Sequence, residues 1–337
     1  PSGILIITPE SLESFLMNRR EIAEYILESL QYIVIDELHA FIGTERGIQL
    51  QSLLSRVEIM VNRRIPRIAM SATFSDFDSV KAFLRNKSEF PCSVILQEKS
   101  SHEVKILIKE YISSENVNVG DNICNGILNK LRGTNNLVFV NSRFEAEEYT
   151  TKLKILCEEN NIPNEFRIHH GNLSSEIRGS VERELQEGRY PVTAICTSTL
   201  ELGVDIGKVK SIAQIGVANS VSGLRQRLGR SGRRNEPSIL RILSIDGESG
   251  LLDELRKNLF QNIAVVELLK EHKFETLSVG NYHFSTLIQQ LLSLIASYGG
   301  ILAKEAWHYL CINGVFKNIT PSVFLKLLHC LGEKKVI

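Results

Sequence analysis

The chain has 337 residues, of which 43% are hydrophobic and 23% charged, and its 39 basic and 39 acidic residues give a formal net charge of zero. This length allows two domains with sizeable cores, and this composition excludes an intrinsically disordered chain. Zero net charge also excludes a histone-like protein that attracts nucleic acid through a global positive field, so any such binding must depend on locally placed Lys and Arg.

The first block of the chain alternates short apolar runs with helix-length amphipathic segments, a pattern typical of a parallel sheet covered by helices. The spacing of apolar residues predicts strands at 3–8, 31–36 and 66–71, and helices at 10–17, 46–62 and 76–85. These elements make only part of a sheet. We therefore expect an incomplete first α/β domain over residues 1–98.

The second block contains enough elements for a complete parallel sheet. Strands are predicted at 104–112, 136–141, 165–169, 192–197, 210–216 and 238–244. Helices are predicted between them at 120–132, 143–160, 174–187 and 222–229. This alternation indicates a second, doubly wound α/β domain over residues 99–247.

The last block is predicted to be helical, with helices at 251–269, 284–298, 303–312 and 320–331. Residues 248–282 are expected to form a helical connector, and residues 283–337 have the size and spacing of a partial winged-helix or helix-turn-helix core. Trp307, the only tryptophan, could stack on a base, but we favour packing in the core of this segment.

The six cysteines are scattered without a CxxC pair, which argues against a zinc knuckle or an iron–sulfur cluster and is typical of reduced intracellular thiols. The sequence contains no apolar run that approaches the roughly 20 residues needed to span a bilayer, and it opens without a secretory leader. We therefore expect a cytoplasmic protein with no membrane partner.

Two carboxylates follow one of the predicted strands. The apolar run 32–35 ends in Asp36 and Glu37, with His39 just beyond. A buried strand that delivers carboxylates to a sheet edge is a usual way to build a Mg²⁺–nucleotide site, although such a strand also occurs by chance in α/β proteins. We assign Asp36 to Mg²⁺, through its water shell, and Glu37 to orienting the attacking water.

Two further strings follow in order, Ser71-Ala72-Thr73 and QRLGRSGRR at 226–234. DELH at 36–39 resembles motif II of superfamily two DExH-box helicases. The Ser-Ala-Thr string resembles motif III, and the arginine-rich string resembles motif VI. The sequence is similar to the large helicase-related (Lhr-like) family of DNA translocases at three strings. They are TPESLESFL at 8–16, DELHAFIGTERG at 36–47 and TSTLELGVDIG at 197–207. The resemblance implies two RecA-like domains, with a winged helix after the second.

The resemblance also implies the activity and the cofactors. In that family, ATP with Mg²⁺ drives movement along single-stranded DNA, usually 3′ to 5′, and unwinds DNA or RNA–DNA duplexes. The expected partner is single-stranded or partly duplex DNA, with RNA or an RNA–DNA hybrid as a possibility.

The resemblance assigns roles to individual residues. His39 links the nucleotide to motifs III and VI, although it could instead be a satisfied core histidine. Arg230 and Arg233 are the arginine fingers, and they share a helical face if the helix continues that far; the plain alternative is a solvated basic loop. The remaining assignments are Gln226 near the γ-phosphate, Ser71 and Thr73 in coupling, and Gly203 and Asp205 in nucleotide binding.

Backbone contacts to nucleic acid are expected from loops at strand ends. By resemblance the candidates are Thr8 in motif Ib, Arg143 after the motif IV strand, Gly171 after the next strand, and Thr197 in motif V. Ordinary helix capping is the alternative for Thr8 and for Ser142. Arg227 is expected to be structural or interdomain.

One motif of the family is missing, because no GxxxxGK[ST] phosphate-binding loop exists in the sequence. Without that cradle of backbone N–H groups and its lysine, these 337 residues alone should bind and hydrolyse ATP poorly. We expect a fragment whose loop lies upstream. The alternatives are a nucleic-acid-binding or regulatory module that never hydrolyses ATP, and a related DExH helicase directed at RNA.

Overall fold

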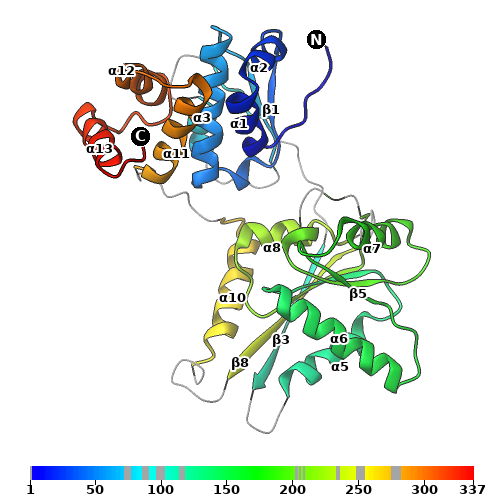
Figure 1. Ribbon diagram of the computed structural model, residues 1–337. Helices are drawn as coiled ribbons and strands as arrows, with labels where there is room; N and C mark the ends of the chain where they lie inside the picture. Colours follow the sequence, from blue (N-terminus) through cyan, green and yellow to red (C-terminus); the bar gives the residue numbers. More distant parts are fainter. Residues whose placement is uncertain are drawn as a thin grey trace. The chain divides into compact units, whose positions relative to one another are not determined.

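The computed structural model describes residues 2–71, 77–85, 91–95, 103–113, 118–201, 204, 206–207, 209–232, 236–247, 255–274 and 282–337. The chain divides into two compact units. Unit 1 comprises Pro1–Ile95 together with Thr276–Ile337, and unit 2 comprises Leu96–Glu275. Figure 1 shows both units, with labels on many of their helices and strands.

The first part of unit 1 is a small parallel sheet with helices. Its elements are α1 (Pro9–Asn18), α2 (Arg20–Leu27), β1 (Ile33–Ile35), the 3₁₀ turn η1 (Leu38–Ala40), α3 (Glu45–Met60), β2 (Arg67–Ala69) and α4 (Phe77–Leu84). β1 and β2 pair in parallel, with Ile33 opposite Arg67 and Ile35 opposite Ala69. Side chains from β1, α3 and α4 form one of its cores, and α1, α2 and α3 form another.

The strand predicted at 3–8 is not formed. Ile4 and Ile6 are 94% and 93% exposed, and α1 begins at Pro9. An extended apolar segment becomes a strand only when another strand pairs with it, and among the described residues none does. The sequence also did not predict α2, in which Ala23 and Leu27 are buried four residues apart.

The second part of unit 1 is helical. Its elements are α11 (Phe284–Tyr298), α12 (Ala303–Trp307), the π-helical turn η3 (His308–Ile312) and α13 (Pro321–Glu333), at the predicted positions. α11 packs against α1 and α3 (Figure 1). Trp307 packs on the core of this segment, with its ring edge-on to Phe324 at 5.3 Å between centroids. Its surroundings therefore favour the core role over base stacking.

Unit 2 contains a six-stranded sheet, all of it parallel. The strands are β3 (Val104–Ser113), β4 (Asn136–Phe139), β5 (Phe166–His169), β6 (Thr193–Cys196), β7 (Ser211–Ile215) and β8 (Ser238–Gly247). They lie in the order β3-β8-β7-β4-β6-β5. Together with β1 and β2, this sheet confirms the predicted α/β class with parallel sheets.

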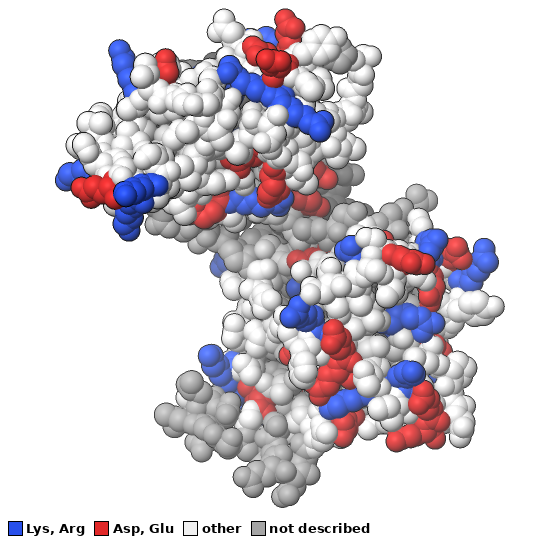
Figure 2. Space-filling view, viewed as in Figure 1, with Lys and Arg blue, Asp and Glu red and all other residues white. Residues whose placement is uncertain are grey.

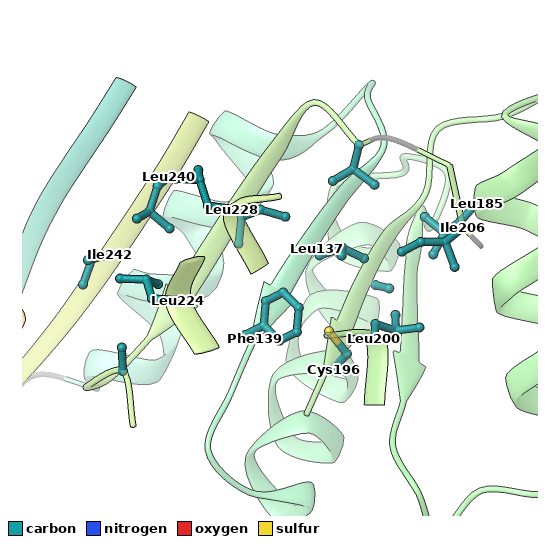
Figure 3. Close-up of a cluster of buried hydrophobic side chains, with 14 of the residues drawn as sticks. Leu137, Phe139, Leu185, Cys196, Leu200, Ile206, Leu224, Leu228, Leu240 and Ile242 are labelled. Carbon is teal, nitrogen blue, oxygen red and sulfur yellow. The ribbon is translucent and has the colours of Figure 1, made fainter. Parts of the chain in front are cut away.

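Helices cover both faces of this sheet. α5 (Val119–Leu131) and α6 (Arg143–Glu159) pack on one face, where Val138 and Val140 point. α7 (Ser175–Glu187) and α8 (Val221–Leu228) pack on the other, where Leu137 and Phe139 point. Figure 3 shows this second core, with Leu224 and Leu228 of α8 beside Leu240 and Ile242 of β8. Successive side chains along β4 thus alternate between the two cores, one on each face of the sheet.

A third helix, α10 (Lys257–Lys270), also belongs to the second core. Val266 and Leu269 are 3% and 4% exposed and pack with the α8 and β8 side chains. Residues 248–282 were expected to be a connector; instead, α10 packs against α8 and β8 and extends unit 2 to Glu275. Among the described residues, no helix is long and apolar enough to cross a membrane.

Candidate functional site

The two predicted carboxylates lie in the turn that follows β1. Asp36 is exposed, and its Oδ1 accepts the Glu37 backbone N–H at 2.9 Å. Glu37 has a positive φ of 48°, a left-handed conformation that is uncommon for a non-glycine residue and occurs often at functional sites. Because carboxylate oxygens are the ligands that Mg²⁺ takes, Asp36 and the half-buried Glu37 fit a Mg²⁺ site.

His39 joins this turn to the segment after β2. Its Nδ1 lies 2.8 Å from Ser71 Oγ and 3.3 Å from Glu37 Oε2, and its side chain is 11% exposed. The predicted contact from His39 toward the Ser-Ala-Thr string is therefore present. Main-chain bonds support it, because Leu38 N–H donates to the Met70 carbonyl at 3.0 Å. Thr73, the other predicted coupling residue, lies outside the described residues.

The arginine-rich string begins on α8 and continues beyond its end. α8 is capped by the Ser220 hydroxyl and ends at Leu228, so Gln226 is helical but Arg230 lies in the following turn. The helical face that Arg230 and Arg233 were expected to share is therefore not formed at Arg230, because α8 ends at Leu228. Arg233 lies outside the described residues.

Arg227 is buried at the carboxyl edge of the sheet, with 6% of its surface exposed. Its Nε and Nη2 lie 3.0 and 2.9 Å from Glu201 Oε2, and Nη1 donates to Gln214. The guanidinium carbon also lies 4.7 Å from the ring centre of Phe139. These contacts join the strand ends of β4, β6 and β7, which supports the predicted structural role.

Arg230 binds main-chain oxygens of the segment that follows β6. Its Nε and Nη2 each lie 3.2 Å from the Glu201 carbonyl, and Nη1 lies 2.7 Å from the Val204 carbonyl. In this arrangement the guanidinium fastens the loop that contains the predicted nucleotide-binding residues. Those residues themselves, Gly203 and Asp205, lie outside the described part of the chain.

Three of the four predicted nucleic-acid residues follow neighbouring strands of unit 2. Arg143 follows β4, Gly171 follows β5 and Thr197 follows β6. The register places Phe139 and His169 both opposite Cys196, so the three strands end at the same level. Parallel strands bring these residues to one edge of the sheet, where open α/β sheets bind ligands.

The local geometry of these residues differs. Arg143 is exposed at the start of α6, directly after a capping box made by Ser142 and Glu145. Gly171 is exposed, while Thr197 is half-buried and donates its N–H to the His169 carbonyl at 3.3 Å. Ser142 therefore takes the capping role that was its alternative interpretation.

Thr8, the fourth predicted residue, lies in unit 1. Its hydroxyl caps α1 by accepting the Ser11 N–H at 3.2 Å, and the residue is exposed. The capping alternative is thus realised, and the exposed position leaves Thr8 accessible.

Sequence reasoning assigned no role to two residues close to this edge. One is Glu201, which binds both arginines; the other is His169, which is buried between Thr199 Oγ1 at 2.8 Å and Glu182 Oε1 at 2.9 Å. Burial lowers the pKa of His169 below its ordinary value, against the effect of Glu182. The polar pair His169–His170 at the end of an apolar strand is the sequence signal that could have revealed it.

The surface charge matches the neutral composition. Figure 2 shows Lys and Arg interspersed with Asp and Glu over the face in view. Binding of a polyanion would then depend on single cations at defined positions, and the exposed Arg143 is a candidate.

Comparison with known proteins gives two family matches. A sequence model of the DEAD/DEAH box helicases matches residues 2–81, and one of the helicase conserved C-terminal domain matches residues 118–235. The first match contains the DELH turn, and the second contains the string on α8.

Individual relatives match over most of the chain. The ATP-dependent helicase Lhr-Core of Methanocaldococcus jannaschii is 29% identical over 98% of this chain and 38% of its own length. The Lhr helicase/uracil glycosylase of Escherichia coli is 29% identical over 91% of this chain and 22% of its own. The chain therefore spans less than two fifths of the length of these relatives.

The fold is also found among solved structures. The Mycobacterium smegmatis helicase Lhr, solved with single-stranded DNA and AMP-PNP, superposes with a TM-score of 0.80 at 27% identity, covering 96% of this chain and 41% of that one.

Proposed function

Because the chain is an Lhr-like member of the DEAD/DEAH box helicases, we propose that it is part of an ATP-dependent helicase that moves along single-stranded DNA from 3′ to 5′. The hydrogen bond between His39 and Ser71 carries this proposal, because it fastens the acidic turn after β1 to the segment after β2. The DNA-bound relative supports DNA as the partner.

In this proposal the turn after β1 is the catalytic centre. Bound ATP supplies the phosphoanhydride whose cleavage drives movement. Asp36 would hold Mg²⁺, which would neutralise phosphate charge, and Glu37 would orient the attacking water. The left-handed backbone at Glu37 supports this role, because such a conformation is uncommon for a non-glycine residue and occurs often at functional sites.

The arginine-rich string supplies the positive charge. Gln226 contacts the γ-phosphate, and Arg230 and Arg233 act as fingers that stabilise the charge of the transition state. To reach a phosphate, Arg230 must exchange its bonds to the Glu201 and Val204 carbonyls for phosphate oxygens. We propose that this exchange makes the loop after β6 sensitive to nucleotide.

Nucleic acid binds, in this proposal, along the carboxyl edge of the unit 2 sheet. Arg143 provides a charge, while Gly171 and Thr197 provide an exposed backbone and a hydroxyl for phosphates. Thr8 makes the corresponding contact from unit 1. Because three of these groups follow adjacent strands, they suit a run of successive phosphates.

A second candidate function is a nucleic-acid-binding module that does not hydrolyse ATP. The absence of a GxxxxGK[ST] string from these 337 residues favours it. For the same reason, we propose that this chain alone turns over little ATP and that activity requires the full-length protein.

The test is ATP hydrolysis by the full-length protein with single-stranded DNA or RNA, comparing wild type with Glu37→Gln. Glu24→Gln, an exposed acid on α2, is the matched control. We expect nucleic acid to stimulate ATP turnover by wild type. Glu37→Gln should lower this turnover at least about 100-fold while nucleotide binding is kept. Glu24→Gln should retain the stimulated turnover. DNA binding without turnover supports the second candidate. Stronger stimulation by RNA would exclude the DNA preference, and duplexes with 3′ or 5′ tails test the direction.

A further inference from the structure

The segment Thr44–Gly47, called here the TERG segment, comprises the N-cap and the first three residues of α3, and Thr44 lies eight residues after Asp36. Its contacts anchor it to the turn after β1. Thr44 Oγ1 donates to the Phe41 carbonyl at 2.8 Å and accepts the Gly47 N–H at 3.0 Å. Phe41 in turn donates its N–H to the Leu38 carbonyl.

Gly47 fixes this connection more tightly than any other residue could. A Cβ at this position would lie 1.8 Å from the Phe41 carbonyl oxygen, far inside the contact distance. The start of α3 therefore rests directly on the backbone that follows DELH. A displacement of the acidic turn would therefore also displace the TERG segment.

Arg46 extends from this segment to the first turn of α1, which Thr8 caps. Its Nε lies 2.6 Å from Glu10 Oε1, and its Nη2 lies 3.1 Å from Glu10 Oε2, which is the two-point geometry that makes such pairs specific. The hydrogen bond from Arg46 lowers the pKa of Glu10 to about 2, so the pair stays ionised at neutral pH. Glu10 is two residues beyond Thr8, in the first turn of α1.

Glu45, the neighbouring residue, binds elsewhere. Its carboxylate lies 2.7 Å from His283 Nδ1 and accepts from Ser285 and Thr286 at the start of α11. The side chains of Glu45 and Arg46 are both about half exposed. The two charges of one segment thus have separate partners, one on α11 and one on α1.

We propose that Arg46 is a positioning residue that couples the acidic turn to nucleic-acid binding by holding Glu10, and with it Thr8, in place. The argument rests on the proposed function. The route runs from Glu37 through η1 and Phe41 to Arg46 and then to α1. Glu45 is not on this route, because it binds the helical segment instead.

The test uses the full-length protein and measures ATP hydrolysis against the concentration of single-stranded DNA for wild type, Glu10→Gln, Arg46→Gln and the double variant. In each single variant the DNA concentration for half-maximal stimulation should rise about three- to fivefold, the range available to one exposed ion pair. The rate without DNA should stay the same. The double variant should match the single variants, because both remove one interaction.

Glu45→Gln is the matched control, since it removes one carboxylate from the same segment at similar exposure. It should leave the half-maximal concentration unchanged. A rise equal to that of Arg46→Gln would overturn the proposal, because it would show a general loosening of the segment. Additive losses in the double variant, or an unchanged value in Arg46→Gln, would overturn it as well.

Failure of the proposed function gives a different result. If wild type shows no ATP turnover that depends on Glu37, the helicase proposal fails. The coupling role then fails with it. If DNA stimulates wild type normally and the Arg46 and Glu10 variants behave like wild type, the helicase proposal stands. The coupling role alone is then overturned.

Discussion

Arg227 and Arg230 lie three residues apart, yet their guanidinium groups bind different kinds of partner. Arg227 is paired with the Glu201 carboxylate in a buried site, whereas Arg230 binds backbone carbonyls at a less buried position. The two side chains of a buried ion pair stay paired, because a buried charge without its partner has a large desolvation cost. Bonds to carbonyls are more easily exchanged for bonds to phosphate.

Replacing Arg227 with Ala should therefore destabilise unit 2 by about 3–5 kcal/mol, because the Glu201 side chain, only 12% exposed, would lose its partner. Urea unfolding of the chain measures this loss. Arg225→Ala on the same helix is the control, and it should cost less than about 1 kcal/mol. Equal losses in the two variants would show that the buried pair contributes nothing specific.

Glu58 makes a second buried cluster, in unit 1, with Arg64, Arg67 and Arg85. Burial alone would raise its pKa, but the hydrogen bond from Arg85 and the charge of Arg67 outweigh burial and lower the pKa below the ordinary 4.5. The unfolded state then binds more protons than the folded state in this pH range. The stabilisation is therefore present above about pH 4.5 and is lost as the pH falls toward the folded-state pKa.

The free energy of unfolding should fall more steeply below pH 4.5 in wild type than in Glu58→Gln. Urea unfolding at pH 7, 5 and 4 checks this, with Glu24→Gln as the exposed control. A stability difference between wild type and Glu58→Gln that stays constant over this range would contradict the assignment.

At the residue scale, the sequence indicated candidate residues but not most of their contacts. Asp36, Glu37 and His39 could be proposed because the strings that resemble motifs III and VI follow them in order, and the contact of His39 with Ser71 is present. The partners of Arg230 could not be predicted, because they are backbone carbonyls, which every residue has. Long-range side-chain pairs such as Arg46 with Glu10 are also invisible in a single sequence.

Among the elements, α3 shows how one glycine can determine a junction. Gly47→Ala should destabilise unit 1 by about 1–3 kcal/mol or more, because the new methyl group would collide with the Phe41 carbonyl and contact the Phe83 ring. Urea unfolding of the chain measures the change.

Gly179 in α7 is the matched comparison, because a Cβ there would have no neighbour within 4 Å. Gly179→Ala should stabilise unit 2 by roughly 0.5–1 kcal/mol, since alanine restricts the unfolded chain and favours the helix. If the two substitutions had the same effect, the close approach at Gly47 would not be a real constraint.

Apart from α2, the described helices could be placed from sequence to within a few residues, whereas the formation of a strand depended on its neighbours. The apolar spacing that predicted a helix at 46–62 corresponds to α3, and the hydroxyl of Thr44 sets its start. Residues 3–8 have the composition of a strand but lack a paired neighbour among the described residues, so their side chains stay exposed. Periodicity reports which face is apolar, and pairing depends on residues far away in the chain.

For the molecule as a whole, the end of unit 2 was the hardest feature to predict. The predicted boundary at 247 follows the last strand, where the alternating pattern stops. The helix beyond it was predicted, but its packing partners could not be, because an amphipathic helix does not specify which core it joins. In the structure α10 covers the α8–β8 side of the sheet, and unit 2 ends at Glu275.

This difference predicts how pieces of the protein will fold. Residues 96–275 should fold alone with a cooperative transition, because they contain the whole six-stranded sheet and the helices of both faces. Residues 96–247 should be less stable by about 3–6 kcal/mol, since they lose Val266 and Leu269, two fully buried side chains worth about 1.5–3 kcal/mol each. Urea unfolding followed by circular dichroism compares the two. Equal stability would mean that α10 is a connector after all, and that the unit ends with its last strand.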